Sequence, residues 1–380
     1  MKNTADKHLH IVAFAVPYPP NYGGVIDIFY KVKALYQAGI KVHLHAFTYK
    51  QHRPSDELAA YCESIHYYPR RTGWKANCSI KPYIVQSRIS EQMVESLSRD
   101  DYPVLFEGLH TCGIIEHQRL KNKRKIYRES NIEHHYYFNL FKAEKNLLKK
   151  PYFLIESLKL RLFQKKLRHS DLMLVVSQKD TDYLQKHFPW KKVIHLPSFH
   201  PNERLSITPG ISNFALYHGN LSVAENYLAA EYLIEKVFAH TDIPLIIAGL
   251  HPPQRLQELA VRYANVTIEP NPDEERMFYL IREAQVHVLV TFQATGLKLK
   301  LLNTLYNGRH ILVNPAMVSG THAESICELG KNADELIAKV NVLINNAFDE
   351  TAINERKQLL DKYYSNQTNV ADLMKVVWDE

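Results

Sequence analysis

Residues 295–313 have the sequence Thr-Gly-Leu-Lys-Leu-Lys-Leu-Leu-Asn-Thr-Leu-Tyr-Asn-Gly-Arg-His-Ile-Leu-Val. The stretch predicts a tight turn, a helix of about three turns and a buried strand, because Thr295 can cap the helix and Asn307-Gly308 can end it. Another apolar strand is expected just before it, at residues 286–290. Strand, turn, helix and strand together form the crossover unit of a parallel sheet.

The charge at the start of this helix indicates a bound anion. The first turn carries Lys298, followed by Lys300, and it holds no carboxylate, although the positive end of a helix dipole favours acids. Two cations at that end suggest an absent anion, and phosphate is the usual one. The alternative is a pair of solvated lysines on an ordinary amphipathic helix.

The same alternation of strands and helices runs through the whole chain. Apolar strands separated by helical patterns are expected at 8–16, 40–47, 64–68, 104–107, 125–128, 172–176, 214–218, 244–248, 266–269 and 286–290. They predict an α/β fold with two doubly wound, Rossmann-like sheets and ligands at the carboxyl ends of the strands. The proline-bearing segment 196–203 is the expected linker.

Composition bounds the class of protein. The chain has 380 residues, 46% hydrophobic and 23% charged, which suits two globular domains. Its four cysteines are far apart and lack metal-ligand spacing, as expected of reduced thiols in the cytoplasm. The N-terminus is polar, and no apolar run approaches the roughly 20 residues of a membrane span. We expect a cytoplasmic protein, either free or peripheral on the inner face of the plasma membrane.

Charge is divided unevenly between the two halves. Residues 1–200 carry 32 Lys/Arg and 18 Asp/Glu, a balance of +14, whereas residues 201–380 carry 15 and 22, a balance of −7. This asymmetry predicts that the two domains face different partners.

A second turn, Gly219-Asn220-Leu221, follows the first strand of the second half. A glycine at this position lets backbone amides approach a phosphate closely. A plain structural turn would have the same sequence. Because both turns follow strands of one parallel sheet, we expect them at the same edge, where they would form one diphosphate site.

These segments resemble the GT-B glycosyltransferases, specifically the large retaining group that includes glycogen-synthase-like enzymes and mannosyltransferases. Residues 295–308 are similar to the Thr-Gly-Ile-Lys-x-Lys pattern of one branch of that group. Similar segments lie in both halves of the chain, at 18–24, 131–137, 176–177, 196–197, 217–221, 244–249 and 286–290. The resemblance covers nearly the whole chain and implies two domains that face a cleft.

The resemblance implies an acceptor-binding domain at 1–197, a nucleotide-sugar domain at 198–352, and C-terminal helices at 353–380 that cross back to the first domain. Two glutamates that the family often has, for the donor sugar and the ribose, fall here at Thr295 and Asn303. Asn303 can still hydrogen-bond a ribose hydroxyl, without the strength that a carboxylate's charge adds. The implied donor site comprises Gly24, Gly219, Asn220, Thr295, Gly296, Leu297, Lys298 and Asn303.

The first half supplies a candidate catalytic histidine and an acceptor site. The family frequently places a histidine near the donor sugar, and His110 follows the strand that ends at Glu107. The alternative for His110, one of 20 histidines, is a structural role. Glu133, His134 and His135 could hold a metal, but neighbouring histidines rarely converge on one ion, so none is expected. The acceptor cleft is expected to include Asn21, Tyr22, Gly23, Asn131, Glu133 and His134.

A basic segment at 142–168 needs its own interpretation. It contains nine Lys/Arg and only two acids, Glu144 and Glu156, with leucines and aromatic residues between them. Pro151 is expected in the first turn of a helix there. Such a helix can lie on an anionic membrane surface. The alternatives are a core-facing helix with a solvated basic face and a nucleic-acid site, although no nucleic-acid recognition motif accompanies the charge.

The sequence therefore predicts a hexosyltransferase that moves a sugar from a nucleotide-sugar to a glycan or lipid-linked acceptor, with retention implied by the resemblance. Lys298, with the amides near Gly219 and Gly296, would neutralise the leaving diphosphate without a metal cofactor. The alternatives are a nucleotide-sugar epimerase of the same fold and, because of Asn303, a relative that binds without turnover.

Overall fold

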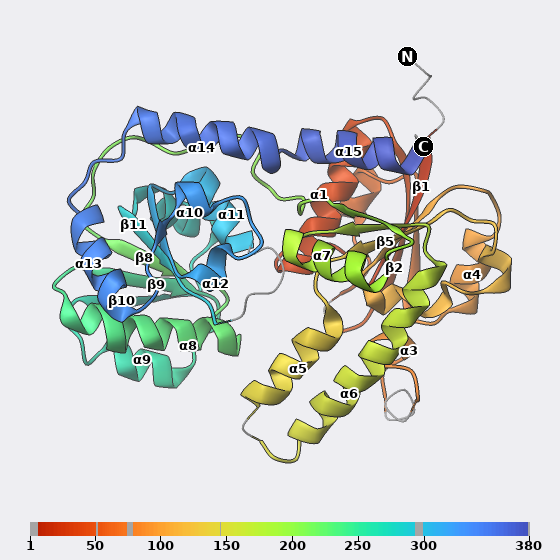
Figure 1. Ribbon diagram of the computed structural model, residues 1–380, viewed down its shortest axis with the longest axis horizontal. Helices are drawn as coiled ribbons and strands as arrows, with labels where there is room; N and C mark the ends of the chain where they lie inside the picture. Colours follow the sequence, from red (N-terminus) through yellow and green to blue (C-terminus); the bar gives the residue numbers. More distant parts are fainter. Residues whose placement is uncertain (1–6, 51, 74–78, 145, 293–298, 379–380) are drawn as a thin grey trace. The chain divides into compact units, whose positions relative to one another are not determined.

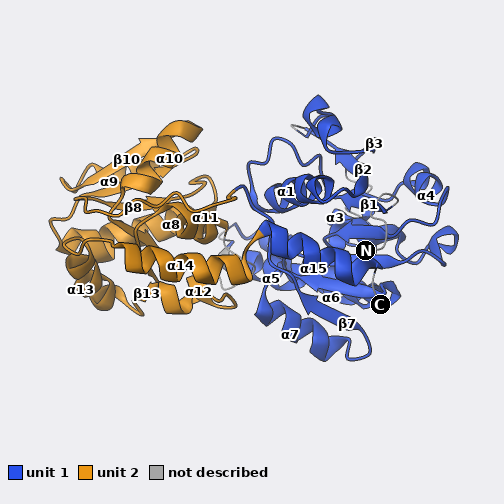
Figure 2. Cartoon of the chain, turned by 90° about the horizontal axis from the view of Figure 1, so that it is seen from above, with its two compact units in different colours: residues 1–201, 295–297, 366–380 blue, residues 202–294, 298–365 orange. Residues whose placement is uncertain are grey.

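The chain folds as two compact units (Figure 2). The structure, a computed structural model, describes residues 7–50, 52–73, 79–144, 146–292 and 299–378. Within those residues, unit 1 comprises 7–201 and 366–378, and unit 2 comprises 202–292 and 299–365. Each unit is built on one parallel sheet covered by helices (Figure 1).

Unit 1 contains a seven-stranded parallel sheet with the strand order β3-β2-β1-β4-β5-β6-β7. Its strands are β1 (His8–Ala13), β2 (Lys41–Thr48), β3 (Ser64–Pro69), β4 (Val104–Glu107), β5 (Lys125–Glu129), β6 (Leu172–Val175) and β7 (Lys192–His195). Its helices are α1 (Gly23–Gln37), α3 (Tyr83–Gln86), α4 (Glu91–Leu97), α5 (Glu133–Ala143), α6 (Lys150–Phe163), α7 (Gln178–His187) and α15 (Asn366–Trp378). The edge strand β7 was not predicted, because its four residues show no distinct apolar pattern.

Unit 2 contains a six-stranded parallel sheet with the strand order β10-β9-β8-β11-β12-β13. Its strands are β8 (Ala215–His218), β9 (Leu245–Gly249), β10 (Val266–Pro270), β11 (Val286–Leu289), β12 (His310–Val313) and β13 (Glu328–Leu329). Its helices are α8 (Ala224–Tyr232), α9 (Gln254–Ala260), α10 (Glu274–Glu283), α11 (Leu299–Asn307), α12 (Pro315–Val318), α13 (Ala333–Leu343) and α14 (Glu350–Tyr363). The predicted fold class, two doubly wound α/β units, is confirmed.

The C-terminal helices belong to different units. In α14, the buried Arg356 donates to the carbonyls of Gly308 and Arg309 in unit 2. In α15, Val370, Leu373 and Val377 pack into the core of unit 1 beside α1. The expected third segment, 353–380, is therefore divided, and only its last helix lies in unit 1.

The expected linker at 196–203 is mostly part of unit 1. Residues 196–200 are all buried, and the chain passes to unit 2 after Pro201 rather than after residue 197. Arg128 donates to the carbonyls of Leu196 and Pro197, at 2.5 and 3.0 Å, and Phe199 N–H donates to Asp27 at 2.7 Å. These bonds fix the segment against the sheet.

Four buried charged residues hold this region together. Lys31 Nζ lies 2.8 Å from Asp27 Oδ2 and 2.6 Å from Glu107 Oε1, and Arg128 Nη2 lies 3.2 Å from Asp27 Oδ1. Burial alone would raise the pKa of Asp27, but Arg128 and Lys31 outweigh it and lower that pKa to about 2. Asp27 is therefore charged and balanced by Arg128 and Lys31, whereas burial raises the pKa of Glu107 above its usual value.

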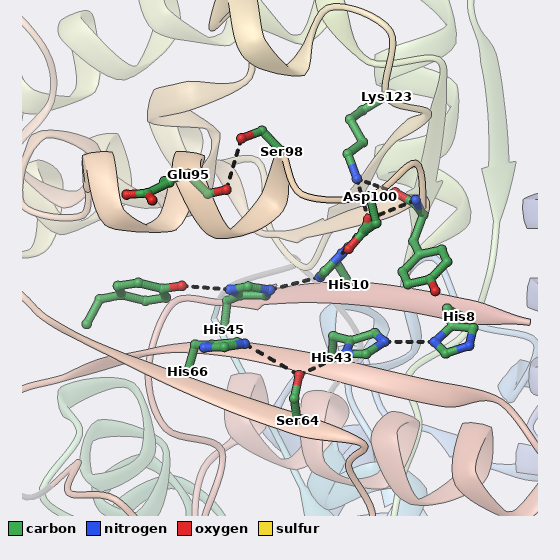
Figure 3. Close-up of polar contacts among 12 residues, drawn as sticks. His8, His10, His43, His45, Ser64, His66, Glu95, Ser98, Asp100 and Lys123 are labelled. Carbon is green, nitrogen blue, oxygen red and sulfur yellow. Dashed lines mark hydrogen bonds and ion pairs between the residues drawn. The ribbon is translucent and has the colours of Figure 1, made fainter.

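A histidine network crosses the neighbouring strands β1, β2 and β3 (Figure 3). Tyr68 bonds to His45 at 2.9 Å, His45 to His10 at 2.9 Å, and His10 to Asp100 at 3.0 Å. A parallel chain joins His8 to His43 at 2.8 Å, His43 to Ser64 at 2.8 Å, and Ser64 to His66 at 3.4 Å. Burial lowers the pKa of His10 to about 4 and that of His45 well below its usual value, so these two rings are neutral at pH 7.

We expect this network to make unit 1 sensitive to acid. An unfolded His10 takes up a proton below about pH 6.5, whereas the folded His10 resists protonation down to about pH 4, so stability falls as pH falls between these values. His10 alone accounts for about 3 kcal/mol when the shift is complete. Urea unfolding across this pH range measures how steeply the free energy of unfolding depends on pH. This dependence should be weaker in His10→Asn and unchanged in the exposed control His240→Asn. The same dependence in His10→Asn and in the wild type would contradict the assignment.

Candidate functional site

Helix α11 carries the lysine-bearing motif of unit 2. It begins at Leu299, has no acidic residue in its first turn, and ends at Asn307, where Gly308 N–H donates to Thr304 O at 2.8 Å. The predicted helix end and the strand that follows it, β12, are confirmed. Polar side chains recur on one face of the helix, at i, i+3, i+4 and i+7: Lys300, Asn303, Thr304 and Asn307.

Lys300 contacts the end of the neighbouring strand β8. Its Nζ lies 3.0 Å from Asn226 Oδ1 and 3.3 Å from the Tyr217 hydroxyl, and it lies over the Tyr217 ring, 5.0 Å from the centroid. Asn226 in turn donates from Nδ2 to Asn220 O at 2.9 Å. The Asn226 side chain thus joins Lys300 to the Gly219 turn, so the two motifs meet at one edge of the sheet.

The Gly219 turn has fewer free amides than the sequence suggested. Gly219 N–H donates to Ala248 O at 3.1 Å, Leu221 N–H to Leu250 O at 2.9 Å, and Ser222 N–H to the Asn220 side chain at 3.1 Å. Within this fully described turn, only the Asn220 amide lacks a protein acceptor. The donor-site role expected of the turn therefore rests on Asn220 rather than on Gly219.

Gly249, at the end of β9, makes this turn possible. A Cβ at residue 249 would lie 1.8 Å from the Gly219 carbonyl oxygen, closer than any real contact. Glycine at 249 therefore allows the backbone of the turn to pass directly beside the adjacent strand.

Asn303, where the family often has an acid, lies among other amides. Its Oδ1 accepts a bond from Asn307 Nδ2 at 2.9 Å, and Asn307 also contacts Asn202 at 2.9 Å and Ser206 at 2.6 Å. No described group accepts a bond from Asn303 Nδ2, which can therefore donate to a ligand hydroxyl. Thr295, Gly296, Leu297 and Lys298 lie outside the described residues.

In unit 1, a glycine turn after β4 positions His110. Gly108 has φ +70°, a conformation that favours glycine, and a Cβ there would lie 2.9 Å from His110 Nδ1. The ring of Phe14 lies 5.1 Å from that of His110, and a Cβ on Gly24 would lie 2.6 Å from Phe14 Cζ. Gly24, Phe14 and His110 are therefore close neighbours at the carboxyl end of the sheet.

His110 has one acidic neighbour, Glu133, with Nδ1 3.8 Å from Glu133 Oε1. Burial raises the pKa of Glu133 to about 8. Burial is also the main reason that the pKa of His110 lies well below its usual value, and the positive charges of Arg88 and Arg70 lower it further. Both groups are therefore mainly neutral at pH 7. A neutral imidazole suits hydrogen bonding to a sugar hydroxyl better than proton donation.

Of the other expected acceptor residues, Tyr22 lies within electrostatic range of Arg88 and Arg70, whereas Asn131 and His134 have other partners. Asn21, Tyr22 and Gly23 are exposed at the start of α1, and Asn131 N–H donates to Glu129 Oε1 at 3.0 Å. His134 does not join Glu133 in facing His110, because its Nε2 lies 3.3 Å from the Tyr183 hydroxyl of α7. In the described parts of the chain, no group of three or more His, Cys, Asp or Glu could hold a metal ion.

Two arginines near His110 were missed in the sequence. Arg70 follows β3 directly, and Arg88 lies just after α3. Burial is the largest cause of the lowered pKa of His110, and the charges of both arginines lower it further. Both arginines therefore lie within electrostatic range of His110. The sequence could have indicated Arg70 as a site residue, because Arg70 follows the carboxyl end of a predicted strand, as His110 does.

Comparison with known proteins identifies the fold. No protein-family model matches the chain. An uncharacterized 44.6 kDa protein in the cps region of Klebsiella pneumoniae is 26% identical over 381 residues, which cover 94% of this chain and 96% of that protein. Its name assigns no activity.

Solved structures of glycosyltransferases are similar over almost the full length. Sucrose-phosphate synthase from Thermosynechococcus elongatus has a TM-score of 0.69 at 13% identity, and the match covers 98% of both chains. A TarM variant from S. aureus, solved with UDP and alpha-GlcNAc-glycerol, has a TM-score of 0.68 at 9% identity, covering 98% of this chain and 100% of that chain. The chain therefore has the GT-B fold, as the sequence predicted.

Proposed function

We propose that this protein transfers a hexose from a nucleotide-sugar to a glycan or lipid-linked acceptor in polysaccharide biosynthesis, with retention of anomeric configuration. One observation carries the proposal: Asn226 joins Lys300 of α11 to Asn220, so both phosphate-binding motifs converge at the end of β8. Glycosyltransferases of the same fold support the reaction class.

The chemistry follows from the charges that develop during transfer. The bond between the anomeric carbon and the diphosphate oxygen breaks, and the nucleoside diphosphate leaves with the electron pair. The acceptor oxygen forms the new bond to the anomeric carbon, and its proton passes to an oxygen of the leaving diphosphate. Lys298 and the amides of Asn220 and Gly296 would stabilise the leaving diphosphate, which requires no metal, while neutral His110 would hydrogen-bond the donor sugar. Asn303 would donate to the ribose.

The second candidate function, binding of a nucleotide-sugar without turnover, is favoured by Asn303. Calorimetric titration with UDP and GDP first shows which nucleotide binds. Incubation with nucleotide-sugars that carry that nucleotide then separates the two functions. We expect binding together with release of nucleoside diphosphate that an acceptor accelerates. Binding without release or transfer would support the second function, and no binding of either nucleotide would contradict both.

We also propose that α6 contacts an anionic membrane surface. The helix buries Leu160 and Phe163, yet its other side exposes Ile155, Leu158 and Leu162 by 51%, 54% and 66%. The turn before α6 adds two more exposed leucines, Leu147 and Leu148, at 79% and 91%. In Figure 1, α5 and α6 pack side by side and extend away from the sheet. A core-facing helix would not leave so many apolar side chains in water.

The charges around this stripe match an anionic surface. Lys149, Arg161 and Lys165 are exposed, whereas Glu156 is buried, paired with Lys159 and bonded to Tyr83 N–H. No described helix is long and apolar enough to span a bilayer. The proposed contact is therefore peripheral, through leucines that enter the interface and basic residues that contact lipid headgroups.

We expect the double variant Leu158→Gln/Leu162→Gln to lose vesicle binding by about tenfold or more, because two exposed leucines no longer enter the interface. Flotation with phosphatidylglycerol-containing vesicles measures the loss. The control is Val261→Gln in unit 2, an apolar residue that is 86% exposed. The proposal would be contradicted if the wild-type protein did not float with the vesicles. It would also be contradicted if Val261→Gln lost as much vesicle binding as the double variant.

A further inference from the structure

Arg88 is a buried cation without an acidic partner among the described residues. Its side chain is almost fully enclosed, with the residue 3% exposed, and it donates from Nε to Phe14 O and from Nη1 to Ile84 O, both at 2.7 Å. These carbonyl bonds position the guanidinium but do not neutralise it. Burying a charge without a counter-charge is costly, so the arrangement suggests an anion that binds there.

Arg70 supplies a second guanidinium within electrostatic range of the first, where it lowers the pKa of Arg88 after the larger effect of burial. Its Cζ lies 4.6 Å from the centroid of the Tyr49 ring, and Arg88 Cζ lies 5.7 Å from the same centroid. Arg70 Nε donates to Ser87 Oγ at 3.0 Å, and no described group accepts a bond from either Nη atom. Arg70 is only half-buried, so these donors can reach a ligand from solvent.

The groups around the two arginines carry no compensating negative charge at pH 7. They are the phenols of Tyr22 and Tyr49, the imidazoles of His52 and His110, and the Glu133 carboxyl. Phenols are uncharged at pH 7, and burial raises the pKa of Glu133 to about 8, so that carboxyl is mainly uncharged as well. The cluster therefore has a charge of about +2.

The cluster lies at the edge of the sheet where ligands bind in such folds. Its members follow the carboxyl ends of five adjacent strands, with Tyr22 after β1, Tyr49 after β2, Arg70 after β3, His110 after β4 and Glu133 after β5. It includes His110, the candidate for contact with the donor sugar. A ligand held by the arginines would thus lie near His110.

We propose that Arg70 and Arg88 bind a phosphate group of the acceptor. The inference rests on the proposed function, because it assigns the acceptor of that same site to the class of sugar or lipid phosphates. A phosphate dianion matches two guanidiniums in charge, and each planar guanidinium can donate two parallel bonds to its oxygens. A carboxylate would leave one positive charge unbalanced.

The test is a calorimetric titration with inorganic phosphate, run with and without saturating UDP, which fills the proposed donor site in unit 2. We expect wild-type protein to bind phosphate under both conditions. Arg70→Gln should weaken that binding by about tenfold or more, since it removes two charge-assisted bonds. The matched control is Arg71→Gln, because Arg71 is the adjacent exposed arginine, and it should bind like the wild type.

Three results would overturn the proposal: no saturable phosphate binding to the wild type, equal affinity in Arg70→Gln, or an equal loss in Arg71→Gln. Arg88→Lys supplies a second variant that keeps the charge but loses the paired donors, and it should also weaken binding. Unchanged UDP affinity and thermal midpoint in Arg70→Gln exclude misfolding. If neither UDP nor GDP binds while phosphate binding still depends on Arg70, the proposed function fails and the anion site stands.

Discussion

Replacement of Lys298 by alanine is expected to weaken nucleoside diphosphate binding by about 10- to 100-fold, with little change in stability. A hydrogen bond to a charged group is worth about 1.5–3 kcal/mol, and each 1.4 kcal/mol is about tenfold in affinity. Lys298 immediately precedes α11 in sequence, the first turn of α11 has no acid, and the proposed function assigns the Lys298 charge to the leaving diphosphate. Calorimetry with UDP and GDP measures the loss, and calorimetric unfolding measures stability.

Two further variants test whether the effect belongs to the site. Lys236→Ala removes an exposed lysine of unit 2 and should leave nucleotide affinity unchanged. Lys300→Ala should weaken binding less than Lys298→Ala, because Lys300 contacts Asn226 and acts on the ligand through the Gly219 turn. If Lys298→Ala binds nucleotide as tightly as wild type, the phosphate-site interpretation of this motif is wrong.

Replacement of Arg128 by methionine is expected to destabilise unit 1 by about 3–5 kcal/mol, since it leaves the buried acids Asp27 and Glu107 with Lys31 alone. The variant also removes the bonds to the carbonyls of Leu196 and Pro197 that fix the segment leading to unit 2. Urea unfolding followed by circular dichroism gives the free energy. The loss should grow as pH rises and Glu107, whose pKa burial raises, ionises near Asp27.

The control for this prediction is Arg119→Met, which removes an exposed arginine from the same unit. Surface substitutions of this kind usually change stability by about 0.5 kcal/mol or less. A loss in Arg128→Met no larger than that in Arg119→Met would mean that the buried charges are not a structural requirement.

Much of the candidate donor site could be predicted from local sequence. The end of α11 at Asn307, the strand β12 and the position of the Gly219 turn follow from capping residues and apolar periodicity, and all appear as expected. Because parallel strands align their carboxyl ends, the meeting of the two motifs could also be expected, and Asn226 provides the contact. The roles of Thr295, Gly296 and Lys298 stay predictions.

Other features depend on which way a side chain or an amide points. His134 is adjacent to Glu133 in sequence, but successive residues of a helix face different directions, so only Glu133 lies beside His110. The backbone amides of Gly219 and Leu221 donate hydrogen bonds to the carbonyls of Ala248 and Leu250. No pattern within the turn itself could predict these bonds.

The sequence by itself determined the α/β class and the two doubly wound sheets, and it predicted the edge of each sheet at which ligands are expected, because these follow from periodicity and turn chemistry within short windows. Only the tertiary structure decided which distant residues share one environment. Arg70 and Arg88 meet Tyr49, and Arg128 meets Asp27, across many residues of chain. Their charge states and partners depend on burial, and burial is a property of the packed fold rather than of any local segment.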